Sequence, residues 1–218
     1  MTDAIENGRK LARSARNIAF AGKELEAMLV ALREMLQNET DRLGRIEDDD
    51  DEFVGGGEWI RRAYGYNANV FENVQRRQGQ KGRLRNGERL GTITMLVRLC
   101  GDPSATDADV DWPWIDQACL IVGWHNHEDE REEFWWAEHF EISSENLLHI
   151  KHINQGLWSW QLDDCDYAYF YVIPIFELNS EEKLKKYVVD PLVKLFHQEG
   201  SIRELNSAFE GVPVLSSH

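Results

Sequence analysis

Thr92-Ile-Thr-Met-Leu-Val-Arg-Leu-Cys100 is the stretch that decides the fold. Ile93, Met95, Val97 and Leu99 alternate with their neighbours along it. A period of two is typical of a β-strand that buries one of its faces. The stretch therefore predicts that a sheet region begins here.

Further strands are expected downstream of this stretch, separated by acidic turns. No helical pattern stands between them, and this arrangement favours an antiparallel β-meander of about five strands across residues 90–177. Tyr167–Phe176 is almost continuously apolar, which makes it the best candidate for a central strand. The predicted strands after the first are Asp116–Trp124, Phe134–Ile142, Leu147–Ile153, Leu157–Leu162 and Tyr167–Phe176.

Upstream, residues 5–43 are predicted to form a long N-terminal helix or helical hairpin. Leu11, Ile18, Leu25 and Leu32 recur every seven residues, and a second series of seven runs beside them. This seam has two interpretations. It packs on the sheet of its own chain, or Leu25–Leu43 pairs with a second copy as a homodimer. The second interpretation implies a structural or assembly protein.

The C-terminal part returns to helix. Ser180 can cap a helix that begins with Glu181 and Glu182, and Asp190-Pro191 has the pattern of a cap followed by a first-turn proline. We expect these C-terminal helices to pack on the sheet, which makes the fold class α+β.

The expected organisation has three parts. An N-terminal helical arm covers 1–45, and an antiparallel sheet with C-terminal helices covers 90–218. We expect the arm and the sheet region to form one compact domain. Between them, 46–89 is predicted to be a flexible connection, first acidic and glycine-rich and then basic. A short helix is expected within it at 58–74.

Charge is strongly segregated along the chain. Residues 99–180 hold 17 acidic and two basic residues. The net charge of this segment, −15, equals that of all 218 residues. This balance disfavours direct nucleic-acid binding and contact with anionic membranes, and it favours a basic protein surface as partner. The alternative is that the charge only keeps the protein soluble.

The acidic turns supply the candidate binding residues. Seven of the eight tryptophans also fall in 99–180, and tryptophan is a common anchor of protein interfaces. These side chains serve either as interface anchors or as a tryptophan-rich core. We predict a non-enzymatic binding protein of the inhibitor, immunity or nucleic-acid-mimic type. Its candidate partner-binding residues are Asp109, Asp111, Trp112, Trp114, Glu128, Asp129, Glu132, Glu133, Asp163 and Asp164.

A second hypothesis concerns the string His125-Asn-His127-Glu-Asp129-Glu130, which follows an apolar strand. Residues two apart on an extended chain face the same side, so His125 and His127 could bind one metal ion together with Asp129. The string resembles the His-x-His-x-Asp-His signature of metallo-β-lactamase-like hydrolases, with Glu130 in place of the last histidine. The resemblance implies a metal-dependent hydrolase. The alternative is an acidic turn that contains two histidines.

Other signals indicate no cofactor and a reducing, cytoplasmic location. The three cysteines, Cys100, Cys119 and Cys165, have no metal-binding or disulfide spacing. Gly55–Gly57 is not followed by the Lys-Ser/Thr of a phosphate-binding loop. Met1–Lys10 has no apolar signal-peptide core.

Overall fold

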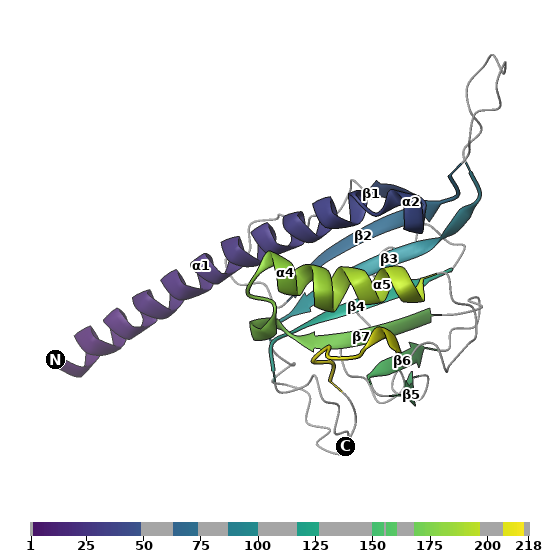
Figure 1. The fold of residues 1–218 in the computed structure, drawn as a ribbon. Helices are drawn as coiled ribbons and strands as arrows, with labels where there is room; N and C mark the ends of the chain where they lie inside the picture. The colour runs from purple at the N-terminus through teal and green to yellow at the C-terminus, as the bar shows by residue number, and fades with distance from the viewer. Residues whose placement is uncertain are drawn as a thin grey trace, which may run out of the picture.

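The computed structural model describes residues 2–48, 63–73, 87–99, 117–126, 150–154, 156–160, 168–196 and 207–215. Within these residues the fold is α+β, with seven strands in one antiparallel sheet and helices on one of its faces (Figure 1). The α+β class and the antiparallel sheet are therefore confirmed. In the described part of the chain, no helix is long and apolar enough to cross a membrane.

The sheet is larger than expected, with seven strands instead of about five. The predicted strand Phe134–Ile142 lies outside the described residues. The two additional strands are β1 and β2. β1 lies at the start of the stretch 46–89 that was expected to be a flexible connection, and β2 lies within it. The strands are β1 (Arg45–Asp48), β2 (Ala63–Phe71), β3 (Arg89–Arg98), β4 (Cys119–His125), β5 (Ile150–Asn154), β6 (Leu157–Trp160) and β7 (Ala168–Pro174).

β2 corrects the prediction of a short helix at 58–74. Gly65, Asn67 and Asn69 weaken the strand signal of this segment. Its partner supplies what the local sequence lacks, because β2 pairs with β3 from one end to the other. The strand is therefore specified by tertiary pairing more than by its own residues.

The strand order is β1-β2-β3-β4-β7-β6-β5, with every described pair antiparallel. β7 pairs with β4, so the hairpin β5–β6 lies outside β7 at the edge of the sheet. The order therefore departs from a simple meander. β7 is an interior strand, and β4 occupies the middle position.

The helices lie at the two ends of the described chain. α1 (Thr2–Gln37) runs along the sheet, and α2 (Thr40–Leu43) leads into β1. Gly44, between α2 and β1, has φ +119, and a Cβ there would lie 2.4 Å from the Phe71 carbonyl oxygen. Only glycine fits this close approach without strain.

After β7, the chain forms a 3₁₀ turn, η2 (Ile175–Glu177), and then a continuous helical segment. This segment consists of α4 (Glu181–Leu184), a π-helical turn, η3 (Lys185–Val189), and α5 (Asp190–Leu195). Ser180 caps α4, its hydroxyl accepting a hydrogen bond from the Lys183 N–H as predicted. Pro191 stands in the first turn of α5 as predicted, but Asp190 is the first residue of this helix and not its cap, because the helix continues directly from η3.

The core lies between the helices and the sheet. Leu25, Leu29, Leu32, Leu36 and Leu43 are buried in one cluster with residues of β2, β3, β4 and β7. The C-terminal helical segment closes the cluster with Val188, Val189 and Leu192 (Figure 1). The leucine stripe of α1 thus packs within its own chain, and a dimer through Leu25–Leu43 would have to remove it from this core.

Candidate functional site at one end of the sheet

The ten candidate partner-binding residues lie outside the described residues. These residues belong to connections between strands, and the structure describes the strand ends at which the connections begin and end. The pairing register places these strand ends relative to one another. The ten are Asp109, Asp111, Trp112, Trp114, Glu128, Asp129, Glu132, Glu133, Asp163 and Asp164.

One row of paired residues marks the first end of the sheet. Thr92 of β3 pairs with His125 of β4, and His125 pairs with Ala168 of β7. Ser159 of β6 pairs with Tyr169, so β6 ends beside the start of β7. β5 begins at the same end, because Ile150 pairs with Trp160.

Two acidic connections are therefore anchored at this end. Residues 126–149 leave after His125 and return at Ile150, and they hold eight acidic residues and one basic residue. Residues 161–167 join β6 to β7 and hold three acidic residues and no basic one. Six of the ten candidates belong to these two connections.

A basic connection is anchored at the same end. Phe71 pairs with Arg89, so residues 72–88 leave β2 and enter β3 there. They hold five basic and two acidic residues. Acidic and basic segments thus share one end of the sheet by the register of β2, β3, β4 and β7.

The connection that carries the other four candidates is anchored at the opposite end. Arg98 pairs with Cys119, so the connection 99–118, which carries Asp109, Asp111, Trp112 and Trp114, begins and ends there. It holds five acidic residues and no basic one. The connections that carry the ten candidates are therefore anchored at two different ends of the sheet.

A polar row crosses the sheet at the first end, on the face opposite the helices. The Arg89 Nε donates to the Asn69 Oδ1 at 3.0 Å, and the Thr92 hydroxyl donates to the same oxygen at 2.8 Å. Arg89 also hydrogen-bonds the Thr92 hydroxyl. His125 continues the row on β4 and is 7% exposed. Sequence reasoning missed this cluster, because Asn69 and Arg89 come together only through the β2–β3 register.

A glycine brings β3 close to β4 beside this row. Gly91 has φ +154, and a Cβ at this position would lie 2.6 Å from the His125 carbonyl oxygen. A larger residue would separate the strands where the acidic connection 126–149 begins. The backbone that anchors this connection is therefore closely packed.

Of the three residues of the metal hypothesis, only His125 is among the described residues. His125 lies in the buried polar row, whereas His127 and Asp129 lie outside the described residues. Among the side chains that the structure describes, no three histidine, cysteine, aspartate or glutamate residues form a group that could hold a metal ion. The hydrolase hypothesis stays a prediction.

Two of the tryptophans belong to the interior. Trp124 is 2% exposed and packs against Tyr169 and Tyr171, with ring centroids 5.7 and 6.5 Å apart. Trp158 is equally buried and stacks on Phe170. Of the two interpretations of the tryptophans, interface anchor or core residue, the second holds for Trp124 and Trp158.

Burial also removes two groups from consideration as nucleophiles. It raises the pKa of the Cys119 thiol to about 12, an effect that nearby Arg98 opposes. It also raises the pKa of Tyr171, whose hydroxyl donates to the Val188 carbonyl at 2.7 Å. Both side chains stay protonated at neutral pH, and a protonated thiol is a poor nucleophile.

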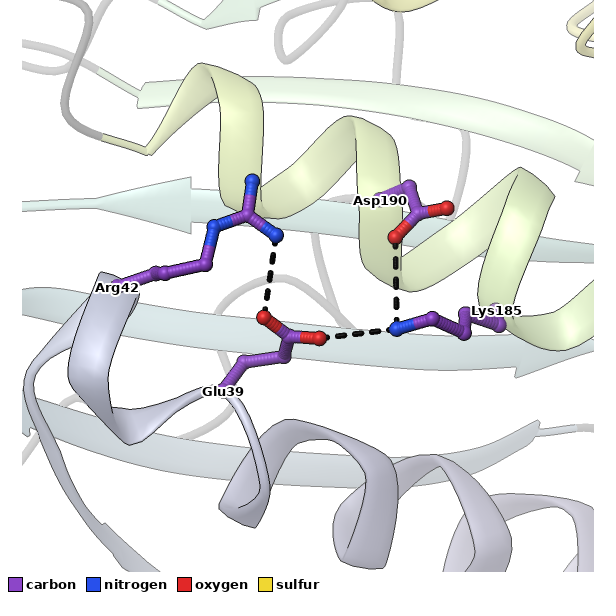
Figure 2. Close-up of polar contacts among 4 residues, drawn as sticks. All are labelled: Glu39, Arg42, Lys185 and Asp190. Atoms are coloured by element: carbon purple, nitrogen blue, oxygen red, sulfur yellow. Dashed lines mark hydrogen bonds and ion pairs between the residues drawn. The ribbon is translucent and has the colours of Figure 1, made fainter.

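On the helical side, a charged network joins α2 to the C-terminal helices (Figure 2). The Lys185 Nζ lies 2.9 Å from the Glu39 Oε1 and 3.6 Å from the Asp190 Oδ1. The Arg42 Nη1 lies 3.1 Å from the other Glu39 oxygen. Glu39 and Lys185 are 146 residues apart in sequence, and no local pattern signals their contact.

Comparisons with protein-family models, with curated proteins and with solved structures found no match to this chain.

Proposed function

We propose that the protein is a non-enzymatic binding protein of the inhibitor, immunity or nucleic-acid-mimic type. It presents carboxylates, together with tryptophans, to a basic surface on another protein. Dense acidic groups of this kind occupy basic active sites or nucleic-acid-binding grooves and accelerate encounter with their targets.

The observation that carries the proposal is the register at the first end of the sheet. Connections 126–149 and 161–167 hold eleven acidic residues and one basic residue between them, and both are anchored beside the His125–Ala168 pair. Two acidic segments that are separate in the sequence are thus anchored at the same end of the sheet. We therefore assign the principal contact to Glu128, Asp129, Glu132, Glu133, Asp163 and Asp164.

The anchoring strands support this role because they are firmly held. Ile121, Val122, Phe170 and Tyr171 of β4 and β7 are at most 1% exposed, and they point alternately to both faces of the sheet. Binding segments are effective when a rigid scaffold positions them. We assign Asp109, Asp111, Trp112 and Trp114, at the opposite end, to a second contact.

The test uses the immobilised full-length chain and an extract of its native host. We expect capture of a basic protein that elutes as sodium chloride rises from about 0.1 to 0.5 M, because salt screens exposed charges. Reversal of Glu128, Asp129, Glu132 and Glu133 to lysine should lower the captured amount at least tenfold.

A matched variant controls for net charge. Glu26, Glu34, Glu182 and Glu210 are exposed acidic residues on other elements, and their replacement by lysine changes the charge equally. This variant should capture the same protein as the wild type. Undiminished capture by the first variant, or equal loss in both, would contradict the assigned surface.

A further inference from the structure

The N-terminal half of α1 extends beyond the sheet (Figure 1). Between Glu6 and Glu24, every residue whose burial the structure describes is exposed, except for the half-buried Gly22. Leu11 is 68% exposed and Phe20 is 62% exposed, whereas Leu25, where contact with the core begins, is 8% exposed. We call residues 6–24 the arm.

The apolar stripe of α1 continues from the core into the arm. Leu11 precedes Leu25 by two heptads, so both lie on the same side of the helix. Most of the stability of a helix in a protein comes from packing of its apolar side chains against another surface. A surface that covers Phe20, which lies on the other side of the arm, would therefore stabilise the arm as a helix.

The opposite side of the arm is basic. Arg9, Arg13, Arg16, Phe20 and Lys23 follow one another at steps of four and three residues, which places them along one face. With Lys10, residues 7–23 carry five basic residues and no acidic one. Subtracting this +5 from the net charge of −15 leaves −20 on the rest of the chain.

We propose that the arm docks on a second copy of this chain. The charge of −20 outside residues 7–23 makes another copy electrostatically complementary to the arm. The same charge repels nucleic acid and anionic membranes, which are the other ligands of a basic helix. Reciprocal docking of two arms would form a closed two-fold dimer.

This dimer differs from one formed through Leu25–Leu43. Those leucines stay in the core of their own chain, and only the arm crosses to the other copy. Pairing of one arm with the other is disfavoured because both carry five basic residues. The arm therefore contacts the acidic part of the second copy.

Sedimentation equilibrium of the full-length chain tests the proposal. We expect a dimer whose dissociation constant rises when salt is increased from about 0.1 to 1 M. Arg9→Glu with Arg16→Glu should raise this constant by about tenfold, since both attractions become repulsions. The control, Lys186→Glu with Lys194→Glu, makes the same charge change at exposed positions of η3 and α5 and should leave the constant unchanged.

Far-UV circular dichroism and thermal melting establish that both variants fold. A wild-type chain that is monomeric at all concentrations would overturn the proposal, as would equal dimerisation of the arm variant and the wild type. A monomer that binds a short DNA duplex or phosphatidylserine vesicles through Arg9 and Arg16 would also overturn it and assign the arm to an anionic ligand instead.

Discussion

Single side chains connect segments that are far apart in this chain. The Tyr171 hydroxyl, in the interior strand β7, donates to the Val188 carbonyl in the π-helical turn η3. Lys185, one turn earlier in the same segment, reaches Glu39 next to α2 (Figure 2). In addition to its apolar packing, the C-terminal helical segment is thus joined to the sheet by a buried hydrogen bond and to the start of α2 by an ion pair.

Replacing Tyr171 with phenylalanine tests the buried contact. The ring would stay, but the Val188 carbonyl would lose its donor in a site closed to water. We expect the free energy of unfolding to fall by about 1–2 kcal/mol in urea denaturation. Tyr187→Phe, at a half-buried position on η3, should change it by less than about 0.5 kcal/mol.

The charged contact predicts a dependence on pH. The hydrogen bond from Lys185 lowers the pKa of Glu39, and Glu39 raises the pKa of Lys185. Glu39 therefore adds stability above the ordinary glutamate pKa of roughly 4.3, and this is lost as pH falls through the lowered folded pKa. The Lys185 contribution is complete below the ordinary lysine pKa of roughly 10.4 and is lost as pH rises through the raised folded pKa.

Lys185→Met should reveal this window. We expect it to lower the free energy of unfolding by about 0.5 kcal/mol at pH 7, since half of the lysine side chain is exposed, and to have no effect near pH 2. Lys194→Met, at an exposed position of α5, serves as the control. A loss that is equal at both pH values would show that the ion pair is not its cause.

At the scale of elements, α1 has two halves with different environments. From Leu25 onward, one face of the helix is buried against the sheet and against η3, whereas the described side chains of the arm are exposed. A single amphipathic pattern runs through both halves, so the sequence alone does not show where contact with the sheet begins. The point at which contact begins depends on how far the sheet extends along the helix.

Leucine-to-alanine substitutions in the two halves should measure the difference. Leu32→Ala removes a fully buried side chain, and we expect it to lower the free energy of unfolding by about 2–5 kcal/mol. Leu11→Ala makes the same chemical change at an exposed position of the same helix. At protein concentrations below dimer formation, its effect should stay under about 0.5 kcal/mol in urea denaturation. Similar losses for both would contradict this division of α1.

For the strands, predictability follows the local signal. β3 was recognisable because Ile93, Met95 and Val97 recur at every second position, with Thr94 and Arg98 among the residues that alternate with them. β2 was not, because Gly65, Asn67 and Asn69 have low strand propensity and only the pairing with β3 holds them extended. Local periodicity identifies a strand that has its own apolar pattern and misses one that depends on its neighbour.

At the scale of the whole molecule, the strand order was beyond local sequence. The apolar run of β7 indicated an interior strand, but nothing in it specified β4 as its neighbour. This pairing determines that connections 126–149 and 161–167 share one end of the sheet. The segregation of charge was visible in the sequence, whereas its division between two ends of the sheet required the register.

The β4–β7 pairing also has a consequence for the order in which the protein is made. Cys119–His125 leaves the ribosome more than 40 residues before its partner Ala168–Pro174. Until then, β4 has one unpaired edge, and the leucines of α1 lack the cover of Val188 and Leu192. A nascent chain interrupted before Ala168 would expose both an open strand edge and an apolar helix face, two features that promote aggregation.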